Sequence, residues 1–201
     1  MQAVDFIFDF GSPNAYFAHK VIPAVAQRTG ARFNYVPCLL GGIFKATGNQ
    51  SPVTAFAGVK NKLEYEQRER DRFVKKHGLT AFRWNPNFPV NTLTIMRGAV
   101  AAEMDGQLAA YVDSMFRGMW EEGRKLDDPA VIMETLASAG FDARRFQQRV
   151  QDQDVKDRLM ANTTRAVERG AFGAPTFFVG DEMWFGKERL GDIEEYLLAA
   201  A

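Results

Sequence analysis

Apolar and polar residues alternate over residues 4–10, a pattern typical of a β-strand. The intervening face is partly apolar too, which indicates a strand covered on both sides. Ser12 and Pro13 suit the N-cap and the first position of a helix, and apolar residues near helical spacing continue to Gly30. A second strand over 33–37 completes a strand–helix–strand unit of the parallel kind.

From about residue 55 to residue 169 the patterns predict helices and no strand. Helix start and stop signals divide this part into several segments. The predicted helices are 64–76, one from Thr92 or Thr94 to Met104, 108–119, one from Asp128-Pro129 to Gly140, one capped by Asp142, and one from Asp152 to Gly170. A loop rich in Asn, Pro and aromatic residues, 82–89, follows the first helix.

Strand patterns return near the C-terminus. Residues 176–179 and 182–185 are short aromatic or β-branched runs around a Gly180-Asp181 turn, which predicts a hairpin, and a final helix follows Gly186. The order β-α-β, helical block, β-β-α is that of an α/β thioredoxin fold with a large all-helical insertion. We expect a thioredoxin-like domain from residues 1–50 and 171–201, and an inserted helical domain from 51–170.

Composition and charge narrow the class of function. Among 201 residues, 46% are hydrophobic, and 25 Lys+Arg balance 25 Asp+Glu, so non-specific binding to nucleic acid or to a membrane surface is not expected. No secretory signal or long apolar span is visible, which favours the cytoplasm. Cys38 is the single cysteine, so no disulfide or CxxC pair forms, and we expect it to be a small buried residue. His19 and His77 lack companions at ligand spacing, so no metal site is predicted.

Five segments resemble the DsbA-like branch of thioredoxin folds, and within it the kappa-class glutathione transferases and the 2-hydroxychromene-2-carboxylate isomerases. The segments are Phe8–Pro13, Gly41–Lys45 with Gly48-Asn49, Lys62–Tyr65, Phe172–Thr176 and Phe185–Leu190. They occur in the right order over nearly the whole chain. The resemblance implies a DsbA/kappa-like fold, a homodimer, and glutathione as the cofactor.

Ser12 has two interpretations with the same geometry. It is a helix N-cap, which Ser-Pro after a strand commonly provides. A helix N-terminus also stabilises an anion and lowers the pKa of a thiol placed there. Redox relatives carry their attacking cysteine at this position, so the resemblance assigns Ser12 to the sulfur of glutathione, as a hydrogen-bond donor and not as a covalent nucleophile.

The resemblance implies further glutathione contacts. The Ala174-Pro175 bond would be cis, leaving the N–H and C=O of Ala174 to pair with the cysteinyl backbone like an added strand; the alternative is an ordinary proline before a strand. In the turn 186–189, Arg189 suits the γ-glutamyl carboxylate and Glu188, where the family usually has Asp, suits the amine. The alternative is a solvated charged turn.

Asn49 and Lys62 match positions that hold the rest of the tripeptide, with Lys60 as a competitor for Lys62 and a solvated surface role as the alternative. The full predicted glutathione-binding set is Ser12, Asn49, Lys62, Ala174, Pro175, Phe185, Gly186, Lys187, Glu188 and Arg189. Lys45, Asn85 and Asn87 are candidates for the substrate side, where a lysine would meet a carboxylate.

The resemblance therefore implies an isomerase of aromatic catabolism that uses glutathione without consuming it. Its substrate would be 2-hydroxychromene-2-carboxylate or a related aromatic pyruvate-type acid, isomerised by reversible thiolate addition, bond rotation and elimination. Two alternatives remain: a kappa-type glutathione transferase, and a non-catalytic module that binds glutathione or another thiol. A dithiol oxidoreductase is excluded, because one cysteine cannot cycle a CxxC pair.

Overall fold

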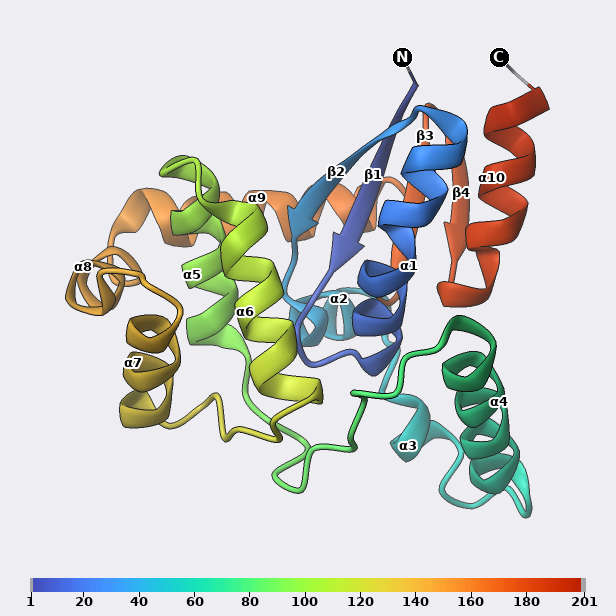
Figure 1. Ribbon diagram of the computed structural model, residues 1–201, viewed down its shortest axis with the longest axis horizontal. Helices are drawn as coiled ribbons and strands as arrows, with labels where there is room; N and C mark the ends of the chain where they lie inside the picture. Colours follow the sequence, from blue (N-terminus) through green and yellow to red (C-terminus); the bar gives the residue numbers. More distant parts are fainter. Residues whose placement is uncertain (1, 200–201) are drawn as a thin grey trace.

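The computed structural model describes residues 2–199 (Figure 1). The strands are β1 (Ala3–Phe8), β2 (Arg32–Pro37), β3 (Thr176–Val179) and β4 (Glu182–Phe185). The α-helices are α1 (Pro13–Thr29), α2 (Leu40–Thr47), α3 (Pro52–Ala55), α4 (Lys62–His77), α5 (Leu93–Met104), α6 (Leu108–Trp120), α7 (Pro129–Ser138), α8 (Ala143–Arg149), α9 (Gln153–Glu168) and α10 (Leu190–Ala199), and a short 3₁₀ helix, η1 (Lys187–Arg189), precedes the last. The predicted order of elements is confirmed.

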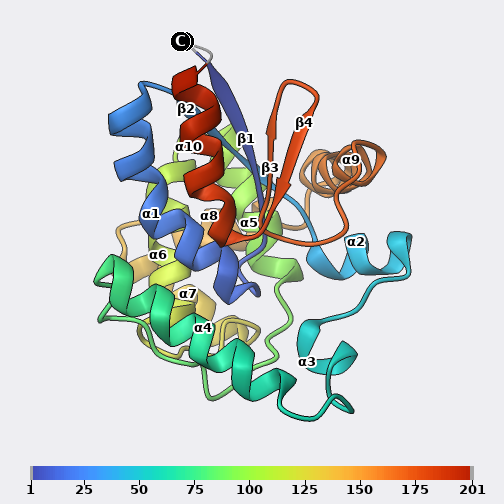
Figure 2. The ribbon, with the colours of Figure 1, turned by 90° about the vertical axis from the view of Figure 1, so that its right-hand side faces the viewer.

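The four strands form one mixed sheet in the order β2-β1-β3-β4. β1 runs parallel to β2 and antiparallel to β3, with Phe6 opposite Tyr35 and Phe177, and β3 and β4 form the predicted hairpin. Figure 2 shows α1 and α10 on one face of the sheet and α9 on the other. β1 is therefore enclosed on both faces, as its pattern predicted, and its end is held in the middle of the molecule.

The helices α5–α8 lie beside the β2 edge of the sheet (Figure 1). Phe116 of α6 contacts Phe8 and Phe10, with ring-centroid distances of 5.9 and 4.9 Å, so these helices share one buried cluster with one face of the sheet. Ile7 and Phe178 belong to a second, smaller cluster. The division into domains at 1–50, 51–170 and 171–201 stays a prediction, and its ends at residues 1 and 200–201 lie outside the described residues.

The sequence patterns missed α2 and α3. α2 contains Gly41 and Gly42, which are poor helix formers, so the helix propensity of this segment is too low to predict a helix. Long-range contacts hold its start: the Leu40 amide donates to Asp9 Oδ2 (2.8 Å), and the Leu39 amide donates to Thr163 Oγ1 (3.0 Å). No helix within residues 2–199 is long and apolar enough to cross a bilayer.

Candidate active site

Ser12 occupies the turn between β1 and α1, at the positive end of the helix dipole. Its backbone is extended, and its Oγ accepts a hydrogen bond of 3.2 Å from the Ala15 amide. Pro13 stands at the first helical position, where its missing N–H leaves nothing unsatisfied. The predicted N-cap is confirmed, and the remaining N–H groups of this turn point where an anion would be stabilised.

Ser12 also contacts the loop that leads into β3. Its Oγ donates a hydrogen bond of 2.9 Å to the carbonyl of Ala174, and the Ala174–Pro175 peptide bond is cis, as the resemblance implied. The carbonyl expected to face a ligand is therefore already engaged. The Ala174 amide, by contrast, donates no hydrogen bond to any atom of residues 2–199. Because the partners of Ser12 Oγ are a carbonyl and an amide, none of residues 2–199 is positioned as a base that would make it a nucleophile.

Asp9 fixes the position of the Ser12 turn, a role that no sequence pattern predicted. Its Oδ1 accepts from the Gly11 amide (2.8 Å) and its Oδ2 from the Leu40 amide (2.8 Å), while Thr92 contributes a side-chain hydrogen bond. Burial raises the pKa of the Asp9 carboxyl, and these hydrogen bonds oppose that rise. The signal that the sequence offered for this role was an acidic residue, Asp9, between apolar residues at the end of the first predicted strand.

The segment that begins at Gly186 lies next to the cis-proline. The Gly186 amide donates to the Pro175 carbonyl (3.0 Å), and Gly186 has φ of +102°, which favours glycine. Arg189 is exposed and pairs with Asp192 at 2.9 Å. This hydrogen bond places Gly186, the first residue of the predicted γ-glutamyl site, beside Pro175. Pro175 directly follows Ala174, whose carbonyl accepts the hydrogen bond from Ser12.

Lys187 is buried, unlike a residue of a solvated turn. Only 5% of its surface is exposed. Its ammonium pairs with Glu188 and lies 5.2 Å from the ring centroid of Phe73 in α4 and 5.9 Å from that of Phe17 in α1. These contacts satisfy the charge within the protein, so Lys187 joins α1, α4 and η1.

Asn49 contacts the loop that leads into β3, and Lys62 lies farther along the chain. The Asn49 side chain donates to the Phe172 carbonyl (2.8 Å), two residues before Ala174. Lys62 begins α4, pairs with Glu66 at 2.5 Å and lies over an aromatic ring, whereas its competitor Lys60 is exposed. The roles of these residues toward glutathione stay predictions.

The three substrate-side candidates lie in different environments. Lys45 is exposed on α2. Asn85 is fully buried: its amide donates to the carbonyls of Met119 and Arg124, both at 2.9 Å, and its oxygen accepts from the Asn87 amide at 2.8 Å. Asn85 therefore holds the 82–89 loop against α6. That placement favours a structural contribution, and direct contact with a substrate stays a prediction.

Cys38 is fully buried, as expected, and burial raises the pKa of its thiol, so it is a poor nucleophile. In the part of the chain that the structure describes, no three His, Cys, Asp or Glu residues gather as a metal site would require. The chemistry of the site therefore centres on the Ser12 hydroxyl, the N-terminus of α1 and the backbone at Ala174.

Comparison with known proteins agrees with this fold. A family model for the DSBA-like thioredoxin domain matches residues 3–198. The 2-hydroxychromene-2-carboxylate isomerase of Pseudomonas putida is 33% identical over 196 residues, covering 95% of this chain and 92% of that protein. Glutathione S-transferase kappa 1 of Caenorhabditis elegans is 26% identical over 210 residues, covering 98% and 91%.

A solved 2-hydroxychromene-2-carboxylate isomerase superposes with a TM-score of 0.85 at 30% identity, covering 98% of this chain and 95% of that chain. Sequence and structure thus lead to the same relatives. The chain belongs to the DSBA-like thioredoxin family and, within it, to the 2-hydroxychromene-2-carboxylate isomerases, which are isomerase enzymes.

Proposed function

We propose that this chain is a glutathione-dependent cis–trans isomerase that acts on 2-hydroxychromene-2-carboxylate or a related aromatic pyruvate-type acid, with the double bond isomerised in the ring-opened form of the substrate. The observation that carries the proposal is the Ser12 hydroxyl at the N-terminus of α1, in contact with the Ala174 carbonyl before a cis-proline. Relatives that carry this isomerase name supply the reaction class.

The residues present fit glutathione. Ser12 would meet the sulfur, the unpaired Ala174 amide would meet the peptide backbone, and the Gly186–Arg189 turn would meet the γ-glutamyl end. Bound glutathione supplies a thiolate that adds reversibly to the conjugated double bond, so that the bond can rotate. Asn49 and either Lys62 or Lys60 would hold the glycyl end.

The contribution of the chain is to stabilise the negative charge on that sulfur. The positive potential at the N-terminus of α1 favours the anion and lowers the pKa of the thiol. The Ser12 hydroxyl can turn from the Ala174 carbonyl to the sulfur, which leaves the carbonyl free to accept a peptide N–H. Lys45 and the 82–89 loop would contact the carboxylate and the ring of the substrate.

A kappa-type transferase is the second candidate, since a kappa transferase is among the relatives. The test is an assay of purified protein with one isomer of the substrate and glutathione, following both isomers by absorbance and free thiol by titration. An isomerase turns over many substrates per glutathione and leaves the thiol concentration unchanged, whereas a transferase consumes one thiol per product.

Glutathione binding is measured separately by thermal and chemical denaturation. Saturation at about 100 times Kd should stabilise the fold by about 2.7 kcal/mol. A stabilised protein without turnover would identify a binding module. Absence of both stabilisation at millimolar glutathione and turnover would overturn the proposal.

A further inference from the structure

Helices α2, α5 and α9 line a cavity of about 350 Å³ that is open to solvent on one side. None of the predicted glutathione or substrate residues lines it. Its walls are largely apolar, with Leu39, Leu93, Leu159 and Val167 among the lining residues. The volume lies within the range of about 300–1,000 Å³ that small-molecule sites occupy.

Two cations also line this cavity, Arg97 from α5 and Lys156 from α9. Both are half-buried, and across residues 2–199 neither has a carboxylate within 4.0 Å. No acidic side chain lines the cavity. Arg158, also on α9 but outside the cavity, pairs with Glu103 at 3.7 Å. The cavity therefore presents two positive charges that have no carboxylate partner among the described residues, so it is suited to a ligand that brings a negative charge.

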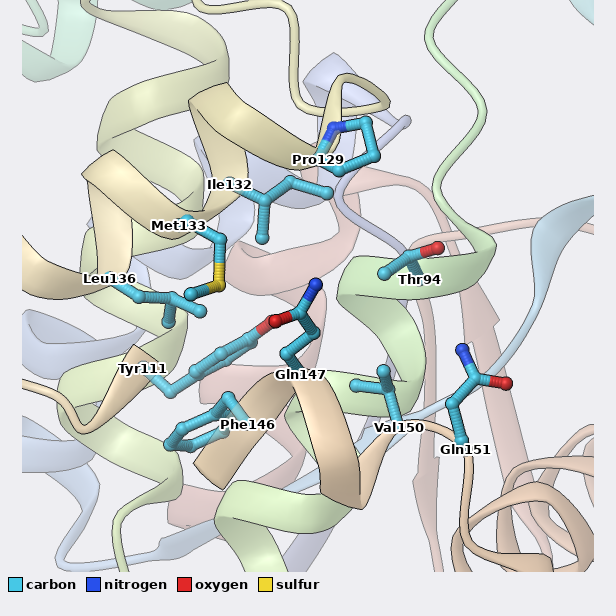
Figure 3. A pocket seen from close by; sticks show the side chains of 10 residues that line it. All are labelled: Thr94, Tyr111, Pro129, Ile132, Met133, Leu136, Phe146, Gln147, Val150 and Gln151. Atoms are coloured by element: carbon cyan, nitrogen blue, oxygen red, sulfur yellow. The ribbon is translucent and has the colours of Figure 1, made fainter. Parts of the chain in front are cut away.

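A smaller cavity between α5, α6, α7 and α8 offers a contrast (Figure 3). Its volume is about 170 Å³, and its lining includes no charged side chain. Figure 3 shows the amide of Gln147 beside the ring of Tyr111 among apolar side chains. This second cavity can accept a neutral ring, so affinity for an aromatic compound alone does not identify the charged cavity.

We propose that the cavity between α2, α5 and α9 is a binding site for a compact aromatic monocarboxylate, separate from the Ser12 site. The ring packs between Leu39, Leu93 and Leu159, and the carboxylate lies between Arg97 and Lys156. This site requires neither glutathione nor Ser12. It therefore stands or falls independently of the isomerase function.

The test is calorimetric titration of the full chain, without glutathione, using 1-naphthoate and its neutral analogue 1-naphthalenemethanol. We expect the carboxylate to bind at least about tenfold more tightly than the alcohol, because only the anion adds charge–charge attraction to its hydrogen bonds with the two cations. Arg97→Gln and Lys156→Gln should each weaken naphthoate binding about tenfold. Arg158→Gln is the matched control and should leave the affinity unchanged, as should Ser12→Ala.

A cavity-filling variant keeps the test decisive if removal of a cation disturbs the fold. Ala46 lines the cavity from the exposed side of α2, so Ala46→Phe fills the space and should abolish binding while the circular dichroism spectrum is retained. Three results would each overturn the proposal. They are no naphthoate binding at millimolar concentration, equal affinity for the alcohol, and an affinity insensitive to Arg97, Lys156 and Ala46.

Discussion

Replacing Ser12 with alanine removes two hydrogen bonds and no packing of consequence. The Ala15 amide loses its cap acceptor, which costs about 1 kcal/mol. The Ala174 carbonyl loses its donor at 2.9 Å, which costs about 1 kcal/mol more in a buried site. We therefore expect the free energy of unfolding to fall by about 2 kcal/mol, measured by urea denaturation without glutathione.

Turnover per folded molecule tests the second role of Ser12. A charge-assisted hydrogen bond to the glutathione thiolate is worth about 1.5–3 kcal/mol, so the Ser12→Ala rate near neutral pH should fall about ten- to a hundredfold. The thiol pKa should rise when this donor is lost, because the hydrogen bond favours the charged form. The pH–rate profile should consequently move to higher pH.

A matched capping variant separates stability from catalysis. Asp128 is the N-cap of α7, precedes a proline as Ser12 does, and accepts from the Ala130 amide at 2.9 Å. Asp128→Ala should lose a similar capping energy and keep its turnover and pH profile. If folded Ser12→Ala also keeps wild-type turnover with an unmoved pH profile, Ser12 is a helix cap alone and the assignment to the thiolate is wrong.

Two further substitutions test the packing and the electrostatics. Gly98→Ala in α5 places a methyl group 2.0 Å from the Tyr111 hydroxyl oxygen, so we expect about 3 kcal/mol of destabilisation in urea, whereas Gly41→Ala in α2 meets nothing within 4 Å and should be neutral or stabilising. The hydrogen bond with His19 lowers the pKa of Asp113, so its contribution to stability is present at neutral pH and is lost as pH falls through that lowered pKa. Thermal melts of Asp113→Asn and wild type should differ at pH 7 and converge in acid; equal melting temperatures at pH 7 would contradict this.

Local signals in the sequence predicted most of the elements. β1 alternates because its two faces are covered to different degrees, and α1 begins at Ser12-Pro13 and ends at Gly30, which has φ of +67°. Each of these features depends on neighbours within a few positions along the chain. Such features are therefore visible without the tertiary structure.

Features that depend on distant partners could not be predicted in the same way. Asn85 is in a loop that looks solvated, yet its partners Met119 and Arg124 lie 34 and 39 positions away. Lys187 looks exposed in the sequence, but aromatic rings of α1 and α4 cover it. In both cases the residue type indicates a polar environment, while the fold supplies that environment inside the protein.

Asp9 is an acidic residue between two phenylalanines at the end of the first strand, and it supports the proposed chemistry by holding the Ser12 turn. Its carboxyl connects the Ser12 turn to α2 and α5 through Gly11, Leu40 and Thr92, which lie far apart in the sequence. Burial raises the pKa of the Asp9 carboxyl, and the hydrogen bonds from the Gly11 and Leu40 amides oppose that rise. These amide hydrogen bonds fix the end of β1 relative to α2, and they hold in place the turn from which Ser12 would meet the sulfur anion.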